Sequence, residues 1–146
     1  MKRIFTVRTA SKGFIVLSAL SILSVSIMAL LNPQMVMDLV QVNLPNNDAY
    51  SSIRGVYGGV GITLCVAIVY TMQKNLQESL GLLGILWGSY ALCRIITVFN
   101  EGQLGAFGNQ WMKIELIFFF IALILFQLNK RSRFQLQQQL KPARKL

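Results

Sequence analysis

The chain has 146 residues, of which 54% are hydrophobic and only 13% are charged, and it carries a formal net charge of +9. A soluble domain carries roughly 25% charged residues, and the apolar residues here form continuous runs instead of one-sided stripes, which argues against a soluble protein. The chain has no histidine, so it lacks the commonest general base and a common metal ligand.

The first apolar run covers residues 14–31, FIVLSALSILSVSIMALL, and follows a basic segment, residues 1–13. The run is uncharged and long enough to span a bilayer as a helix. A cleaved signal peptide is the alternative, because it also has a basic start followed by an apolar stretch. No A-x-A-like site follows the run, so we expect a first membrane span.

The next segment, QMVMDLVQV, places Met35, Val36, Leu39 and Val40 on roughly one side of a helix. It predicts either a short amphipathic helix on the outer membrane surface or an ordered loop. The turn residues Leu44-Pro45-Asn46-Asn47 follow, and we expect Asp48 to cap the next helix.

Three more apolar runs predict spans at residues 49–72, 80–99 and 111–128. Glycines crowd the first two of these spans, with G-x-x-x-G spacing at 55/59 and at 84/88, and small residues let helix backbones approach closely in lipid. We therefore expect five glycines at helix contacts. They are Gly55, Gly58, Gly59, Gly84 and Gly88.

No cofactor or metal site is expected. The stretch GVYGGVG lacks the preceding strand and the soluble βαβ unit that a dinucleotide-binding loop requires. Cys65 and Cys93 lie inside apolar runs, too far apart for a CxxC motif, and are predicted to be small buried hydrophobic residues.

These features predict an all-α, polytopic membrane protein: a four-transmembrane-helix bundle over residues 14–128, followed by a basic tail, residues 129–146. Four basic residues precede the first span and six follow the last, ten of the fourteen in the chain. Basic residues favour the cytoplasmic side, so we expect a multi-pass inner (plasma) membrane protein with cytoplasmic N- and C-termini. These segments can contact anionic lipid headgroups, and no pattern typical of nucleic-acid binding accompanies the charge. The ten are Lys2, Arg3, Arg8, Lys12, Lys130, Arg131, Arg133, Lys141, Arg144 and Lys145.

Arg54, Arg94 and Glu115 are charged residues that lie deeper within the predicted spans, each roughly 6 to 9 Å from the outer end at 1.5 Å rise per residue. Buried charge is costly, so such residues suggest a function. In one interpretation Glu115 neutralises one arginine and the cluster only ties helices together. In the other the cluster binds an anion such as a lipid headgroup, with Tyr57 and Glu101 at its rim. We expect Arg94 to pair with Glu115 and Arg54 to have no such partner.

The segments SIRGVYGGVGI and ALCRIITVFNEGQ, followed by Glu115 in the last span, resemble the bacterial family known as domain of unknown function 4345. The resemblance covers about residues 47–128 and rests on an Arg-Gly-x-Tyr-Gly-Gly signature. Where the family has an Asp-Gly pair, this chain has Glu101-Gly102. The resemblance implies a small four-helix membrane protein and no particular activity.

The sequence favours a non-enzymatic membrane protein that binds lipid or a protein partner through its outer-leaflet Arg/Glu cluster. The partner can be another membrane protein or a second copy of the chain. The alternative is a small transporter that works as an oligomer, although Glu115 lies near one edge of the membrane instead of the midplane. An enzyme is least favoured, and no catalytic residue is predicted, because no nucleophile has a base within expected reach.

Overall fold

The structure is a computed structural model that describes residues 2–140, with side chains for residues 5–134. The described chain is helical and contains no strand. A short π-helical turn, η1, interrupts the second long helical stretch. The elements are α1 (Lys2–Leu31), α2 (Pro33–Asp38), α3 (Asn47–Ile53), η1 (Arg54–Gly59), α4 (Val60–Lys74), α5 (Leu76–Asn100) and α6 (Ala106–Leu140).

Four helical stretches are long and apolar enough to cross a membrane, which confirms the predicted all-α, four-span architecture. The helices extend beyond the predicted spans because a helix does not have to stop where its apolar residues stop. α1 begins within the basic N-terminal segment, and α6 continues past residue 128 through a stretch without glycine or proline. Residues 141–146 of the predicted basic tail lie outside the described residues.

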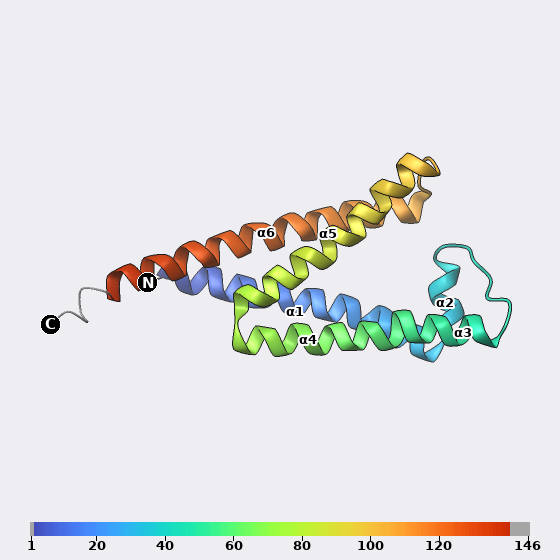
Figure 1. Ribbon diagram of the computed structural model, residues 1–146, viewed down its shortest axis with the longest axis horizontal. Helices are drawn as coiled ribbons and strands as arrows, with labels where there is room; N and C mark the ends of the chain where they lie inside the picture. Colours follow the sequence, from blue (N-terminus) through green and yellow to red (C-terminus); the bar gives the residue numbers. More distant parts are fainter. Residues whose placement is uncertain (1, 141–146) are drawn as a thin grey trace.

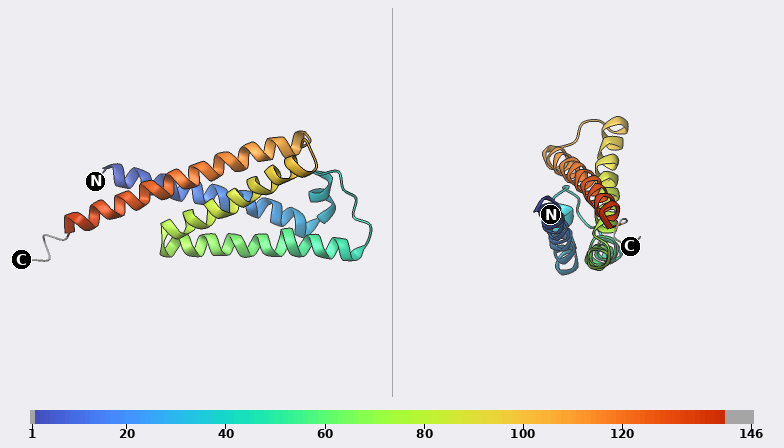
Figure 2. Two further views of the ribbon diagram at one scale, coloured as in Figure 1. Left: turned by 45° about the horizontal axis from the view of Figure 1, so that its top comes forward. Right: turned by 90° about the vertical axis from the view of Figure 1, so that its left-hand side faces the viewer.

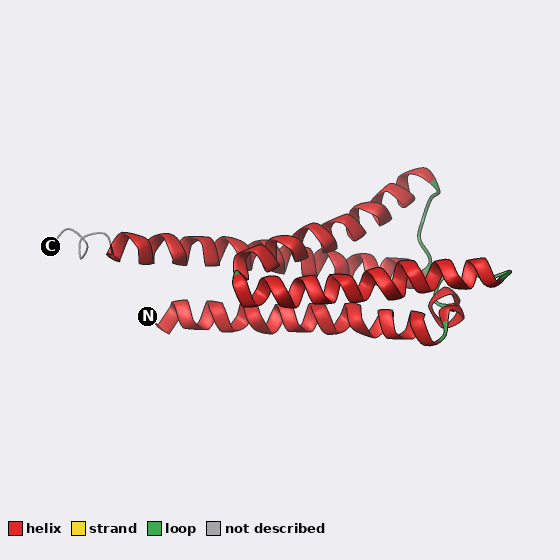
Figure 3. Cartoon of the chain, turned by 60° about the horizontal axis from the view of Figure 1, so that its bottom comes forward, coloured by secondary structure: helices red, strands yellow, loops and turns green. Residues whose placement is uncertain are grey.

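The helices form two antiparallel pairs, α1 with α4 and α5 with α6 (Figure 1). The end-on view in Figure 2 shows α1 and α4 side by side, with α5 and α6 on one side of that pair. The start of α1, the described end of α6 and the α4–α5 turn lie at one end of the bundle, here termed the terminal end. The segment containing α2 and the α5–α6 turn lie at the opposite end, termed the loop end, and only short loops join the helices (Figure 3).

The main apolar core joins all four long helices in the half of the bundle nearer the terminal end. It contains Ile15 of α1, Ile68 of α4, Leu83 and Trp87 of α5, and Ala122 of α6. The buried face of α1 is also rich in serine, whose small side chain allows close helix approach in lipid. Each buried serine hydroxyl has a hydrogen-bond partner, so none is left unsatisfied. The three are Ser11, Ser18 and Ser26.

The segment after α1 folds back onto the end of that helix. The short helix α2 buries Val36 and Met37 against Ala29, whereas Met35 stays half exposed, so the predicted apolar side was only partly right. The expected cap was wrong as well: the Asn46 side chain accepts a hydrogen bond from the Ala49 N–H at 2.9 Å and caps α3. Asp48 lies in the first turn of that helix.

The two cysteines differ in exposure. Cys65 is buried, and its thiol contacts the Ala19 carbonyl at 3.4 Å. Cys93 is exposed on α5, which corrects the prediction that both are buried. An apolar surface is stable in lipid, so an exposed cysteine on a membrane span requires no covering partner.

Candidate functional site

The predicted pair between Arg94 and Glu115 is present and links α5 to α6. The Arg94 Nε donates to Glu115 Oε2 at 2.7 Å, and its Nη2 donates to Oε1 at 2.9 Å. The Glu115 side chain is only 4% exposed and the Arg94 side chain 25% exposed. Both carboxylate oxygens are therefore satisfied in a bidentate arrangement, the strongest form that such an ion pair takes.

One tyrosine lies on the same helix face as Arg94. Tyr90 is on α5, one helical turn before Arg94, and its ring packs against Trp87 with centroids 6.2 Å apart. Tyr57 lies on η1, and among the described residues no hydrogen bond or ring contact joins it to Tyr90 or to the ion pair. Tyr90 was not among the predicted site residues, although its i−4 spacing from Arg94 places the two on one helix face.

Arg54 belongs to a different part of the loop end. Its Nε donates to the Leu30 carbonyl at 3.1 Å, in the last turn of α1. The final carbonyls of a helix lack partners within the helix and carry partial negative charge, so a cation is favourable there. As predicted, Arg54 has no acidic partner among the described residues, but a backbone carbonyl anchors its side chain, which the sequence did not indicate. Among the described residues, no ion pair or hydrogen bond joins it to Glu115 or Glu101.

The guanidinium of Arg54 is only partly used. The side chain is exposed, and among the described residues the Leu30 carbonyl is its one hydrogen-bond acceptor, which engages Nε and leaves both terminal amino groups free. Arg54 also begins η1, so the π-helical turn coincides with the RGVYGG stretch that carries the family signature. Turns of this kind are rare and occur often at functional sites.

Glu101 lies at the C-terminal end of α5, where its backbone N–H donates to the Thr97 carbonyl at 2.8 Å. The residue is exposed in the α5–α6 turn. Its carboxylate has no hydrogen bond or ion pair within the described part of the chain. Of the five predicted site residues, the structure joins Arg94 to Glu115. Among the described residues, Arg54, Tyr57 and Glu101 form no hydrogen bond or ion pair with them.

The glycines fall into two groups. A Cβ at Gly58 would lie 2.6 Å from Leu30 Cδ2, one at Gly84 3.8 Å from the Ala122 Cβ, and one at Gly88 2.9 Å from the Phe119 ring. These glycines therefore face neighbouring helices. The prediction was wrong for Gly55 and Gly59, where a Cβ would meet nothing within 4 Å.

The close contact between α1 and the second span is built instead from Gly58 and a glycine that the sequence reading did not select, Gly61. A Cβ at Gly61 would overlap the Ser26 hydroxyl. The G-x-x-x-G spacing of Gly55 and Gly59 marks one face of a helix but does not specify which neighbour covers it. α1 packs against the other face, so Gly55 and Gly59 point outward.

Within the described residues, no group of three or more cysteine, aspartate or glutamate side chains could hold a metal ion. In comparison with known proteins, residues 10–126 match a family model described as Domain of unknown function (DUF4345). No curated protein and no solved structure matches the chain. The match extends the resemblance seen from residue 47 onward to include the first span. The chain therefore belongs to the DUF4345 family.

Proposed function

We propose that this protein is a non-enzymatic membrane protein of the bacterial inner membrane that binds an anionic lipid headgroup through Arg54 at the loop end of the bundle. The observation that carries the proposal is the partly used guanidinium: Leu30 holds Nε, and the terminal amino groups have no partner among the described residues. Because the guanidinium is already anchored, it loses little conformational freedom when it binds a ligand. Its two free amino groups can donate hydrogen bonds to the oxygens of a phosphate.

The proposed orientation of the chain in the membrane follows from the distribution of its basic residues. Four spans place both termini on the same side of the membrane. Ten of the fourteen basic residues lie in the two terminal segments, and such residues are retained in the cytoplasm. The loop end, with Arg54 near the end of its span, then lies in the outer leaflet, at a depth from which an arginine can reach headgroups.

The Arg94–Glu115 pair has a supporting role in this proposal. Because Glu115 accepts from Arg94 at both oxygens, the pair contributes no net positive charge to an anion. It fixes α5 against α6 near the loop end. Tyr57 is 40% exposed and lies one turn beyond Arg54, where its ring and hydroxyl suit the membrane interface.

A protein partner, including a second copy of the chain, is the other binding hypothesis. The outward glycines Gly55 and Gly59 leave open space beside η1 where another helix could approach. We favour lipid because Arg54 supplies a charge without an acidic counterpart at this face. The transporter alternative gains less support, because a proton-coupling carboxylate must exchange its partner, and Glu115 is buried and bonded at both oxygens.

The test is photo-crosslinking of the full-length protein in nanodiscs that contain a phosphatidylglycerol with a photoactivatable headgroup. We expect labelled peptides from the region of Arg54 and Tyr57, and about fivefold less labelling there in Arg54→Gln, since one basic residue near a surface contributes about 1 kcal/mol. Lys113→Gln is the matched control, because Lys113 is exposed toward the same end on α6. Equal losses in both variants, or labelling that survives in Arg54→Gln, would refute the proposal.

A further inference from the structure

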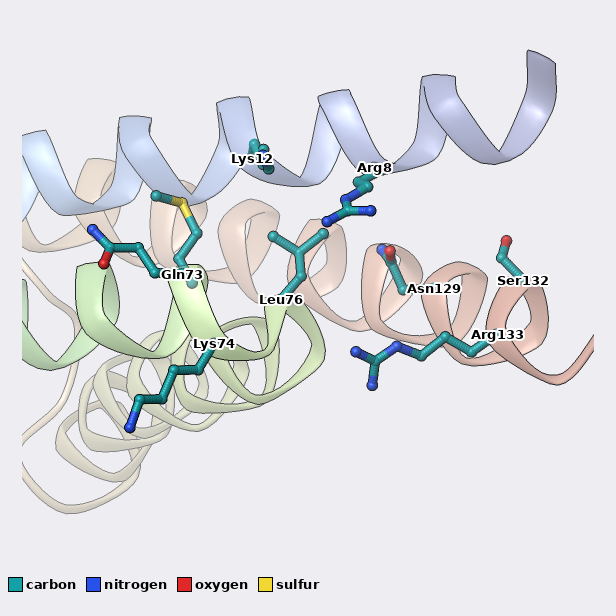
Figure 4. Close-up of a pocket in the computed structure, with 9 residues that line it drawn as sticks. Arg8, Lys12, Gln73, Lys74, Leu76, Asn129, Ser132 and Arg133 are labelled. Carbon is teal, nitrogen blue, oxygen red and sulfur yellow. The ribbon is translucent and has the colours of Figure 1, made fainter. Parts of the chain in front are cut away.

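A basic pocket of about 310 Å³ lies at the terminal end of the bundle, opposite to Arg54. Three separate elements enclose it: the first turns of α1, the junction of α4 and α5, and the part of α6 beyond the predicted span (Figure 4). Arg8 and Lys12 of α1 and Arg133 of α6 contribute the charge. Met72 and Leu76 contribute apolar surface.

Two of the arginine side chains point toward the same region of the pocket. Figure 4 shows the guanidinium groups of Arg8 and Arg133 approaching from opposite sides toward the region beside Leu76. Lys12 follows Arg8 by four residues on the same face of α1, a spacing at which like charges repel. Lys74 also lines the pocket, but its ammonium group contacts the hydroxyl and the ring of Tyr70 and points away.

Among the residues whose side chains the structure describes, no acidic side chain lines the pocket. Glu78 lies close in sequence to the α4–α5 junction, but its carboxylate accepts a hydrogen bond from Asn75 at 2.6 Å and does not face the cavity. Arg8, Lys12 and Arg133 form no salt bridge with any described residue. Their mutual repulsion is thus uncompensated within the described chain, and a bound anion would relieve it.

Hydrogen bonds hold the part of the pocket that Asn129 lines. The Asn129 side chain donates to the Ser11 hydroxyl at 2.7 Å and to the Leu125 carbonyl at 2.8 Å, which ties α6 to α1. Ser11 is fully buried. Because this link holds the two helices together, the two guanidinium groups are held on facing helices without the ligand, and binding does not require the helices to be brought together.

We propose that this pocket binds the phosphate group of an anionic phospholipid from the leaflet on the side of the chain termini. Two guanidinium groups match a phosphate diester, and the Met72 and Leu76 side chains suit the glycerol and upper acyl region of a lipid. The pocket lies where the apolar spans end, at the depth of headgroups, and basic pockets between membrane helices are a recognised type of headgroup site. This site is separate from the one proposed at Arg54.

The experiment measures the thermal stability of the full-length protein in detergent during titration with phosphatidylglycerol, and separately with phosphatidylcholine of the same acyl chains. We expect the wild-type protein to prefer phosphatidylglycerol, and Arg8→Gln/Arg133→Gln to lose about thirtyfold of that preference for two lost cations. Lys130→Gln/Arg131→Gln is the matched control, because it removes the same charge from the same end of the bundle at residues that do not line the pocket. It should keep most of the preference.

Equal losses in the two double variants would overturn the pocket and indicate general surface attraction. Inorganic phosphate that stabilises the wild-type protein as strongly as phosphatidylglycerol would overturn the lipid as the ligand. The readout is a difference between two lipids in one variant, so a change in overall stability does not affect it. If the double variant does not fold, Arg133→Gln alone decides, with Arg131→Gln as its control. Arg54→Gln should reduce the preference by about fivefold at most, the contribution of one basic residue at the other site, and a thirtyfold loss in Arg54→Gln would overturn the pocket as the main site.

Discussion

The α5–α6 hairpin and the η1 turn each place an arginine near the loop end of the bundle, and they accommodate it differently. Arg94 meets a buried carboxylate with two hydrogen bonds, at 2.7 and 2.9 Å. Arg54 meets one backbone carbonyl at 3.1 Å and stays exposed. An apolar span accepts a charge deep in the protein only when a partner cancels it, whereas a charge near the interface needs only to be oriented.

The difference distinguishes a charge that stabilises the fold, that of Arg94, from a charge that is available to bind a ligand, that of Arg54. Removing either member of the Arg94–Glu115 pair leaves the other charge buried and unmatched. Removing Arg54 leaves a helix-end carbonyl, which water or a lipid headgroup can satisfy at the interface. We therefore expect the first arginine to matter for folding and the second mainly for binding, and the following predictions test that distinction.

The largest expected effect concerns the side of the membrane on which both arginines lie. A reporter that is active only in the periplasm should work when fused after Asn46 or after Gly105 and fail when fused after Leu146, since basic terminal segments stay in the cytoplasm. Reporter activity after Asn46 but not after Gly105 would place the two loops on opposite sides of the membrane. Arg54 and Arg94 would then not lie near the same membrane surface. Activity after Leu146 would reverse the orientation.

Glu115→Gln and Arg94→Gln should each destabilise the protein by about 3 kcal/mol, because each strands a buried charge. The double substitution should recover part of the loss, since interacting residues show a coupling energy of about 0.5–3 kcal/mol. Denaturant unfolding in mixed micelles measures all three variants. Strictly additive losses would mean that the two side chains do not depend on each other.

Two glycines of the second span provide a comparison with smaller expected effects on stability. Gly61→Leu should cost about 1–3 kcal/mol, because its side chain would enter the space that the Ser26 hydroxyl occupies between α4 and α1. Gly59→Leu, two residues earlier, should be nearly neutral, because a Cβ there meets nothing within 4 Å. The melting temperatures of the two variants in the same detergent decide the point. A larger loss at Gly59 would indicate a helix neighbour beyond the single chain.

Arg54→Gln should have the smallest effect on stability, about 0.5–1 kcal/mol, the usual contribution of a cation at an exposed helix C-terminus. Arg54→Lys is a useful companion, because it keeps the charge and loses the fixed Nε donor. Thermal unfolding of both variants should give shifts well below that of Glu115→Gln. A loss as large as that of Glu115→Gln would make Arg54 a structural residue and remove the main support for the proposed headgroup site.

Much of the architecture follows from the sequence because hydropathy directly reports which segments can lie in lipid. The pairing of Arg94 with Glu115 was also predictable, since antiparallel neighbours with a short loop bring residues of equal depth together. Helix ends were less predictable: α6 continues beyond its apolar stretch because nothing in the following residues stops a helix.

Features that depend on how separate helices are placed were not predictable. The Leu30 carbonyl that Arg54 binds is a backbone group with no sequence signal. Which glycines contact α1 depends on the rotation of the second span, and spacing alone does not supply that rotation. The basic pocket needs α1, the α4–α5 junction and α6 together, although its charges were individually visible in the sequence.

The π-helical turn η1 has a consequence for how chains of this kind can change in length. A π turn accommodates one residue more than an α-helical turn, so a relative lacking one residue between positions 54 and 59 could close the stretch as a regular α-helix. Because the residue lost would be the extra one of the wide turn, the helix before the turn would keep nearly the same rotation relative to α4, and the contacts of both parts with α1 would persist. A change of one residue in length can thus be absorbed at this turn without rotating the rest of the span. Its effect would fall on the residues of the turn itself, including Arg54.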